Sequence, residues 1–289
     1  EPHGLQWEEQ GYTPREVLRK MGKLGWLGMT YPSEYGGAET DFLTSVVFQE
    51  ALSMSTFGGF IVTVLVHTDM ASPHLIDAGT PEQIQTYLPR IISGELITAV
   101  GISESDAGSD VAGIRTTARR DGSDWVLNGS KMFITNGVHA DLYFIAAKTD
   151  LEAKGSRGIS MFLVEKGTPG FSVGRKLDKQ GWCSSDTAEL VFDECRLPAA
   201  NLLGEENRGF YAVMNNFQIE RIALGAMAIG HALTALRLTT EWTKQRKAFG
   251  GVLYDKQVIR QRLAMLASKT EAARALLYHC AWLANENKE

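Results

Sequence analysis

A single glutamate on an otherwise apolar helix face is the residue of this chain best placed to do chemistry. In the helical pattern of Phe210–Glu241, alternating steps of three and four form one face from Phe217, Glu220, Leu224, Met227 and His231. Apolar neighbours disfavour the charged form of a carboxylate, so its pKa rises toward the range in which it accepts a proton at neutral pH. Glu220 is therefore a candidate general base.

The same spacing also fits a structural carboxylate whose polar partner lies elsewhere in the fold. Structural carboxylates on helices outnumber catalytic ones, and spacing alone favours that interpretation. His231 on the same face is expected to pack and not to react. Other motifs must decide between the two interpretations of Glu220.

Composition and charge exclude several classes of protein. With 289 residues, 44% of them hydrophobic and 22% charged, the chain is expected to be an ordinary soluble protein with two or three domains. A net charge of -5 leaves no basic excess for nucleic acid or an anionic membrane. A few positioned basic groups would still suffice to hold a phosphorylated cofactor.

The cysteines and histidines predict neither disulfides nor a metal site. Cys183, Cys195 and Cys280 are odd in number and widely spaced, which fits a reducing compartment, and no His-Glu-x-x-His motif occurs. Glu1-Pro2-His3-Gly4 lacks the basic segment followed by an apolar one that is typical of a leader. We expect no apolar stretch long enough to span a bilayer, hence no membrane insertion.

Residues 1–97 are predicted to be all helical. Thr13-Pro14 would start a helix with proline at its first position, and Thr80 lies three residues before Gln83, as in a capping box. Two further helix-length apolar patterns are Asp41–Ser53 and Phe60–Ala78, and a turn-rich connector, Tyr31–Gly37, precedes them.

From residue 98 to 206 short β-branched and aromatic runs predict a barrel or sandwich. The expected strands are Thr98–Ser103, Gly113–Arg119, Trp125–Leu127, Lys131–Thr135, Leu142–Ala147, Ile159–Glu165, Phe171–Arg175 and Thr187–Phe192. Asp121-Gly122-Ser123 and Asn128-Gly129 are expected hairpin turns, because these residues tolerate positive φ.

Residues 207–289 contain two long helical patterns. The first, roughly Arg208–Lys244, has a second apolar stripe of Ile219, Ile222, Ala226, Ile229 and Leu233. The second has heptad-like steps at Ile259, Leu263, Leu266, Thr270, Ala273, Leu277 and Cys280, and ends at Lys288-Glu289 without a capping glycine. Two helices cannot enclose such a surface, so we expect further bundle helices or a second subunit to cover it.

Two loops have compositions that suit a bound cofactor. Ile102–Asp110 follows a strand and is rich in small and hydroxyl residues, whose backbone N–H groups allow close approach of a ligand. In Asn128–Gly137, an aromatic and a threonine precede a turn and would suit a flavin ring. A plain surface loop and an ordinary strand are the alternatives, and composition alone favours them.

The order of these motifs resembles the acyl-CoA dehydrogenase family across essentially the whole chain. Four segments carry the resemblance, namely Tyr31–Gly37, Ile102–Asp110, Asn128–Gly137 and Gln245–Gly250. It implies an α+β fold with an N-terminal helical domain (1–97), a central β-barrel domain (98–206) and a C-terminal helical bundle (207–289) of which the first two helices are present. Ser105-Asp106 stands where the family usually has Pro-Gly.

The resemblance implies FAD as cofactor and assigns residues to it. The residues in or next to the two loops are Val100, Ile102, Ser103, Gly108, Ser109, Phe133, Ile134 and Thr135. Arg246, Phe249 and Gln257 follow the first long helix and would reach the FAD of a neighbouring subunit. A permanently charged, bidentate guanidinium such as that of Arg246 suits a diphosphate.

The resemblance also favours the catalytic interpretation of Glu220. Most of the family carries its glutamate base later in the bundle, whereas the long-chain and isovaleryl-CoA dehydrogenases carry it on this helix before an arginine, as in Glu220-Arg221. The implied reaction converts an acyl-CoA thioester to the trans-2-enoyl-CoA, with Glu220 removing the α-proton and flavin N5 accepting the β-hydride. Acyl-CoA contacts are implied for Ser109, Ser156, Arg157, Tyr211, Gln218 and Arg221.

Partners and rival functions follow from the same comparison of motifs. A homotetramer or homodimer, an electron-transfer flavoprotein as acceptor, and the mitochondrial matrix or the bacterial cytoplasm are implied. No Gly-x-Gly-x-x-Gly follows a strand, which disfavours a nicotinamide dehydrogenase. A flavin-dependent acyl-CoA oxidase or monooxygenase on the same fold, and a non-catalytic truncated homologue, remain open alternatives.

Overall fold

The first third of the chain folds into helices, as its capping signals predict. The computed structural model describes residues 2–286, and its N-terminal region comprises α1 (Gly4–Gln10), α2 (Arg15–Lys23), α3 (Phe42–Leu52), α4 (Gly58–Leu65), the π-helical segment η2 (Val66–Ala71), α5 (Pro73–Ala78) and α6 (Pro81–Ile92). The Asp41 side chain caps α3 by accepting from Thr44 N, and Thr80 and Gln83 form the predicted capping box of α6. The helical prediction for this region is confirmed.

One predicted helix start differs in detail. Pro14 precedes α2 instead of occupying its first position, and the Thr13 hydroxyl donates 2.8 Å to the carbonyl of Ser184, in the segment before β7. Residues around Thr13 are therefore recruited into a contact between the helices and the sheet, which local helix signals do not reveal.

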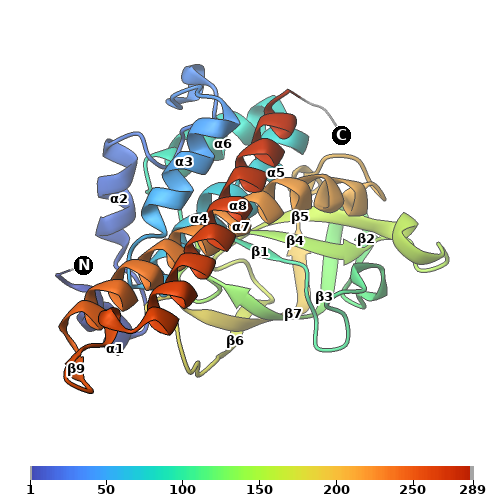
Figure 1. Cartoon of the computed structure of the whole chain (residues 1–289). Coiled ribbons are helices and arrows are strands. Elements are labelled where there is room, and N and C mark those ends of the chain that lie inside the picture. The colour runs from blue at the N-terminus through green and yellow to red at the C-terminus, as the bar shows by residue number, and fades with distance from the viewer. Residues whose placement is uncertain (1, 287–289) are drawn as a thin grey trace.

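Eight strands form one mixed sheet. They are β1 (Thr98–Gly101), β2 (Thr117–Asp121), β3 (Asp124–Thr135), β4 (Leu142–Lys148), β5 (Ile159–Glu165), β6 (Phe171–Lys176), β7 (Thr187–Leu197) and β8 (Leu202–Leu203). The order is β6-β7-β3-β2-β4-β5-β8, and β1 pairs with β4 in parallel. The helices α1 to α6 lie beside this sheet, α7 runs from the sheet across the helices, and α8 packs on α7 and α3 (Figure 1).

The predicted turn at Asn128-Gly129 is wrong. The runs Trp125–Leu127 and Lys131–Thr135 belong to one long strand, β3, whose pairing with β7 shifts register between Leu127 and Gly129. Gly129 has a φ of +138°, and a Cβ there would come within 2.7 Å of Thr116. The glycine therefore permits a bulge and not a hairpin, whereas Asp121–Asp124 does form the predicted hairpin between β2 and β3.

The expected strand over Gly113–Arg119 also begins later than predicted. Val111–Gly113 forms a short 3₁₀ turn, and β2 starts at Thr117. The Arg115 and Thr116 N–H groups donate to Glu104 Oε2 and Oε1 instead of joining the sheet. A carboxylate therefore takes the place of a neighbouring strand as hydrogen-bond acceptor at these residues.

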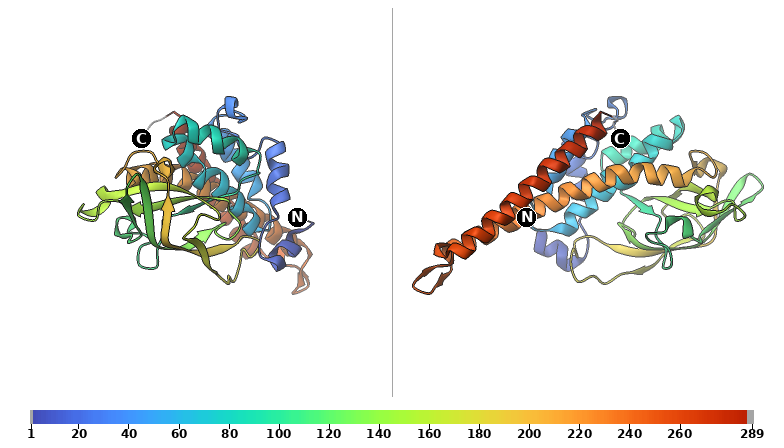
Figure 2. Two further views of the ribbon diagram at one scale, coloured as in Figure 1. Left: turned by 180° about the vertical axis from the view of Figure 1, so that it is seen from behind. Right: turned by 45° about the vertical axis from the view of Figure 1, so that its right-hand side comes forward.

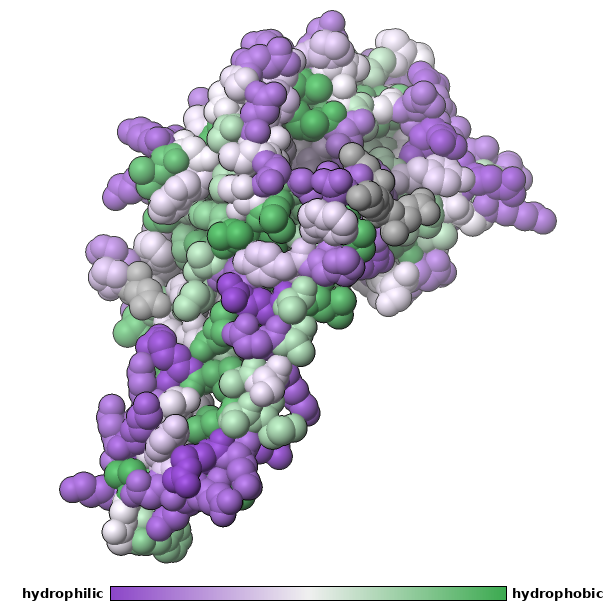
Figure 3. Space-filling model, turned by 45° about the horizontal axis from the view of Figure 1, so that its top comes forward, coloured by the Kyte–Doolittle hydropathy of each residue, from purple (hydrophilic) through white to green (hydrophobic). Residues whose placement is uncertain are grey.

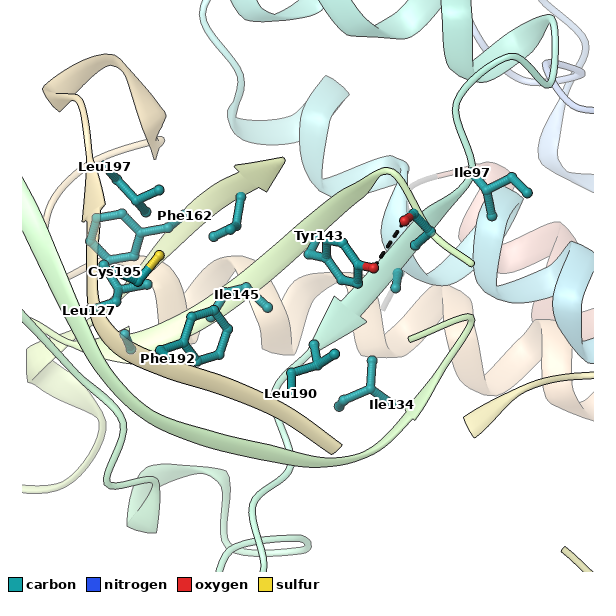
Figure 4. Packing of buried hydrophobic residues seen from close by; sticks show 14 of the residues in the cluster. Ile97, Leu127, Ile134, Tyr143, Ile145, Phe162, Leu190, Phe192, Cys195 and Leu197 are labelled. Carbon is teal, nitrogen blue, oxygen red and sulfur yellow. Dashed lines mark hydrogen bonds between the residues drawn. The ribbon is translucent and has the colours of Figure 1, made fainter. Parts of the chain in front are cut away.

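The main core lies between the two halves of the curved sheet. Side chains of β3 and β7 point toward those of β4 and β5, with Tyr143 and Phe162 fully buried among them (Figure 4). Leu18 of α2 and Val64 of α4 belong to the same buried cluster. The helical region and the sheet therefore share one core and support each other.

The C-terminal region is a long helical hairpin. Helix α7 (Gly209–Gln245) packs on α3, α5, η2 and β5, and α8 (Gln257–Asn285) returns along it after a short hairpin of β9 (Lys247–Ala248) and β10 (Gly251–Val252). The tip of this helical hairpin projects well beyond the rest of the molecule (Figure 2). The predicted end at Lys288-Glu289 lies outside the described residues.

One apolar stripe of α7 is covered and other apolar side chains are not. Ala226 and Ile229 are buried against α3 and α8, as the second stripe predicts. Large apolar side chains nevertheless remain exposed along the projecting pair, where Figure 3 shows scattered apolar surface: Leu238, Trp242, Val258, Met265, Leu266 and Leu276. The expectation that further bundle helices or a second subunit cover this pair stays a prediction.

The expectation that no apolar stretch reaches membrane-spanning length is wrong. Gly58–Ala78 and Gly209–Gln245 are both long and apolar enough by length and composition alone. The apolar window of the first is 78% buried inside the protein, as in the core helix of a globular fold. The second is only 33% buried in this chain, but it carries the uncovered bundle surface just described.

Candidate active site

Glu220 lies partly buried on α7, and a side chain of the same helix holds its carboxylate. Asn216, one turn earlier, donates from Nδ2 to Glu220 Oε1 over 2.8 Å. Burial raises the pKa of Glu220 to about 7, although the hydrogen bond from Asn216 and the positive charge of Arg221 both lower it. A carboxyl group that titrates near neutrality can accept a proton under ordinary conditions.

The π-helical segment η2 brings a second carboxylate close to the first. Asp69 is 7% exposed and accepts hydrogen bonds from Thr68, from Ser45 and, at 2.6 Å, from Gln49. Burial raises its pKa to about 6, and its negative charge contributes to the raised pKa of Glu220. Sequence patterns miss this residue, because a π-helical segment displaces side chains from α-helical spacing.

The apolar face predicted around Glu220 is only partly correct. Phe217 and Met227 pack into buried clusters, but Leu224 is 41% exposed. Successive steps of three and four drift around an α-helix, so residues of one predicted stripe can straddle the edge of the buried face. His231 is partly buried near the Trp182 ring, at 6.3 Å between centroids, in agreement with a packing role.

The loop residues predicted to bind FAD present free donors and one exposed ring. In the part of the chain that the structure describes, the hydroxyls of Ser103, Ser109 and Thr135 have no hydrogen-bond partner. Phe133 is 66% exposed and has a φ of +63°. Unpaired hydroxyls beside an exposed aromatic ring fit a flat group with a polar rim.

The two predicted cofactor segments are tied together by the backbone. Met132 N donates to Ser103 O over 2.9 Å, so the loop after β1 lies alongside the end of β3. Ile134 behaves differently from its neighbours, because its side chain is 3% exposed and points into the sheet core. Only the backbone of Ile134 could therefore contact a ligand.

A buried ion pair braces this loop, and motif analysis of the sequence does not identify it. Lys131 is fully buried, and its Nζ donates to Ile102 O at 3.1 Å and to Glu104 Oε1 at 2.8 Å. The signal for it is a lysine inside an apolar strand. Simple alternation would place Lys131 on the same face as exposed Phe133, but β3 shifts register between Lys131 and Ile134 and turns Lys131 inward.

Strand β1 links the cofactor loop to the helix that carries Glu220. Val100 is partly buried and packs against the cluster containing Met227 and against a second cluster, on which Phe217 also packs. Ile102 is 7% exposed and belongs to the second of these clusters. The predicted cofactor strand and the predicted base therefore lie around the same packed surface, although they are more than a hundred residues apart in the sequence.

The residues predicted to contact acyl-CoA lie on the rim of the molecule. Gln218 and Arg221 are exposed beside Glu220, and Tyr211 is 46% exposed under the Arg208 guanidinium. Two others, Ser156 and Arg157, lie in the 3₁₀ turn Gly155–Gly158, which contacts the turn Val111–Gly113 just after Ser109. Their accessibility allows ligand contact, and the structure brings the Ser109 loop and this turn together.

Three predicted cofactor residues lie far from Glu220 within this chain. Arg246, Phe249 and Gln257 are exposed at the projecting tip of the helical hairpin, with Phe249 90% exposed. The stretch of α7 from Glu220 to Gln245 spans roughly 38 Å at the rise of an α-helix. The tip hairpin also lines an open hollow of about 530 Å³. These residues cannot complete the Glu220 site of their own chain.

Sequence comparison assigns this chain to one enzyme family. The N-terminal, middle and C-terminal domains of acyl-CoA dehydrogenases match residues 1–95, 99–195 and 207–289. The chain belongs to the acyl-CoA dehydrogenase family. The predicted family and its α+β fold are thus confirmed.

Two curated relatives show how much of such a protein the chain represents. The mitochondrial long-chain specific acyl-CoA dehydrogenase of Mus musculus is 43% identical over 282 residues, which cover 96% of this chain and 65% of the mouse protein. The mitochondrial isovaleryl-CoA dehydrogenase of Pongo abelii is 39% identical over 273 residues, or 94% of this chain and 64% of the relative. The chain thus spans about two thirds of the length of these relatives.

Solved structures agree with the sequence relatives. The acyl-CoA dehydrogenase from Geobacillus kaustophilus matches with a TM-score of 0.96 and 42% identity over 100% of this chain and 76% of that structure. An FAD complex of PigA matches with a TM-score of 0.95 and 29% identity over 100% of this chain and 75% of that structure. The chain thus shares its fold with both proteins, and the PigA structure is an FAD complex.

Proposed function

We propose that the complete protein is an FAD-dependent acyl-CoA dehydrogenase in which Glu220 is the general base. One observation carries the proposal: a carboxyl group with a pKa near 7 lies on α7, whose Phe217 and Met227 pack on the same clusters as Val100 of the predicted cofactor strand. Its relatives named long-chain and isovaleryl-CoA dehydrogenase support an acyl-CoA substrate.

The residues present fit FAD. Ser103, Ser109 and Thr135 would donate to the polar edge of the ring system, and Phe133 would pack on its face. When bound, FAD supplies the acceptor for the hydride that leaves the β-carbon of the thioester. The buried pair of Glu104 and Lys131 keeps the backbone of this loop in place whether or not a ligand is present.

Glu220 would remove the proton from the α-carbon of the thioester. The electron pair of the broken C–H bond then forms the new double bond, and the carboxyl group keeps the proton. A pKa near 7 leaves about half of the molecules ionised at neutral pH, which balances availability of the base against its proton affinity. Gln218 and Arg221, exposed on either side of Glu220, would contact the incoming acyl-CoA.

We also propose that the protein is a homodimer or homotetramer. The exposed tip of the helical hairpin places Arg246, Phe249 and Gln257 out of reach of the local site, so they would serve the cofactor of a neighbouring copy. An electron-transfer flavoprotein is the proposed electron acceptor. The proposed compartment is the mitochondrial matrix in a eukaryote or the cytoplasm in a bacterium.

An anaerobic titration tests the proposed function. The FAD-loaded protein is mixed with straight and branched acyl-CoA thioesters of increasing chain length, and loss of the oxidised flavin band is followed. Wild type is expected to bleach with at least one thioester, Glu220→Gln is expected not to bleach, and Glu241→Gln, an exposed glutamate of the same helix, is expected to match wild type.

Two results would contradict the proposal. Equal bleaching of wild type and Glu220→Gln would place the base elsewhere, and failure to bind FAD would favour a non-catalytic homologue. Admitting air after reduction distinguishes an oxidase from a dehydrogenase. The reduced flavin of an oxidase is reoxidised rapidly by oxygen, whereas that of a dehydrogenase stays reduced until its protein acceptor is added.

A further inference from the structure

We propose that Asn216 is a positioning residue for the base: its side-chain amide fixes the Glu220 carboxylate against the backbone of η2 and favours its ionised form. This inference rests on the proposed function for its catalytic meaning. Its structural part, that Asn216 controls the orientation and titration of Glu220, can be tested without any turnover.

The amide of Asn216 bridges two elements. Its Nδ2 donates to Glu220 Oε1 at 2.8 Å and to Met70 O, in η2, at 3.0 Å. An NH₂ group has two hydrogens, and both are used. Because both acceptors are oxygens, the amide cannot be turned around without losing both bonds, so its orientation, and with it the position of the carboxylate, is fixed.

The cost of this arrangement argues against a plain packing role. Asn216 is 1% exposed, and its Oδ1 has no hydrogen-bond partner among the described residues. A buried acceptor without a partner destabilises a fold, and an apolar side chain of similar size would avoid that penalty. An amide at this position is therefore explained by a need for its NH₂ group, which donates to Glu220.

The bridge acts against the other influences on the carboxyl group. Burial and the charge of Asp69, on η2, both favour the protonated form of Glu220, whereas Arg221 on α7 and the Asn216 hydrogen bond favour the ionised form. A base must be ionised to take a proton. Arg221 is exposed and therefore screened by solvent, so Asn216 is the buried group that opposes protonation.

The decisive variant is Asn216→Leu, which keeps the branching at Cγ and removes the donor. Asn216→Ala is the second variant, in case leucine disturbs packing, and the adjacent, exposed Asn215→Ala is the matched control. Circular dichroism and FAD binding establish folding. The first readout is the titration of the Glu220 carboxyl carbon by ¹³C NMR, assigned by its loss in Glu220→Gln.

In both Asn216 variants, we expect Glu220 to titrate about one pH unit higher than in wild type, the size of effect that a lost buried hydrogen bond produces. The ionised fraction at pH 7 should then fall roughly fivefold. Flavin reduction by acyl-CoA at pH 7 should slow by the same factor, with KM changed less than twofold, and should recover as the pH is raised. Asn215→Ala should match wild type in every readout.

The two proposals fail in different ways. If Glu220 titrates at the wild-type pH in both folded Asn216 variants, the positioning role is overturned, whatever the activity. If no acyl-CoA reduces the flavin of wild type, the proposed function fails, while the NMR titration still decides whether Asn216 governs Glu220.

Discussion

Burial raises the pKa of two glutamates of this chain, yet their net pKa shifts have opposite signs. Burial raises the pKa of Glu220 to about 7, because one amide and an exposed arginine only partly offset it. Burial also raises the pKa of Glu104, but the charge of Lys131 and the hydrogen bonds from Lys131, Thr116 and Arg115 outweigh it, and the net pKa is lowered. Burial therefore does not decide the role of a carboxylate; its partners do.

The difference fits the role of proposed base for Glu220 and a structural role for Glu104. Glu104 is saturated with donors and stays ionised, which suits the brace of a loop. Glu220 has one side-chain donor and one free carboxylate oxygen among the described residues, so it can still exchange a proton.

Replacing the two glutamates should affect different properties. Glu220→Gln should lower the rate of flavin reduction on the order of 10²- to 10⁴-fold, the usual contribution of a positioned general base, while the protein remains folded. Glu104→Gln should instead weaken FAD binding and lower Tm. Stopped-flow absorbance and calorimetry measure the two effects, and a reversal of the pattern would break the contrast.

Removing the cation from the buried pair should be costly. Lys131→Met leaves Glu104 buried without its partner and should destabilise the protein by about 3–5 kcal/mol. Arg119→Met, in the exposed pair with Glu194, is the control and should cost about 0–1 kcal/mol. Urea unfolding of both variants gives the comparison, and equal losses would show that the buried pair is no more important than the exposed one.

The pH dependence of stability should differ in sign at the two sites. The pKa of Glu220 is raised from 4.5 to about 7, so its contribution to stability is full below pH 4.5 and is lost as the pH rises through 7; it amounts to about 3 kcal/mol. Glu104 has a lowered pKa, so its contribution is present above pH 4.5 and lost in acid. Between pH 5 and 8, the unfolding free energy of wild type should therefore fall more steeply than that of Glu220→Gln. Parallel slopes would contradict the raised pKa.

A smaller effect is expected from the neighbouring carboxylate. Asp69→Asn removes a negative charge that raises the pKa of Glu220, so the pH at which Glu220 ionises should fall by less than about one unit and activity at pH 6 should rise. The control is Asp77→Asn, whose own raised pKa comes from burial alone. The pH profile of flavin reduction measures this shift. If its acid limb is the same in Asp69→Asn and wild type, the charge of Asp69 does not raise the pKa of Glu220.

Much of this arrangement can be predicted from the sequence because it is local. Caps such as Asp41 and Thr80, the long helices and the position of Glu220 on α7 depend on spacing and short-range hydrogen bonds. The loop Ile102–Asp110 also follows a strand, β1, as predicted. These features depend on residues close in the sequence or on motifs that recur in a family.

The remainder depends on pairings that spacing does not encode. The bulge at Gly129 and the inward turn of Lys131 follow from the register between β3 and β7, whose partners lie about sixty residues apart. Asp69 and the carbonyl of Met70 reach Glu220 and Asn216 only because η2 packs on α7. The exposure of Leu224 reflects which neighbours cover α7, and these are set by the tertiary fold.

The pH dependence of single-turnover flavin reduction by acyl-CoA tests the central claim most directly. If Glu220 is the base, the rate constant of wild type should rise with pH through a midpoint near 7, and Glu220→Gln should lower it on the order of 10²- to 10⁴-fold. A rate that is independent of pH between 5 and 9, or that survives unchanged in Glu220→Gln, would contradict the assignment of Glu220 as the base.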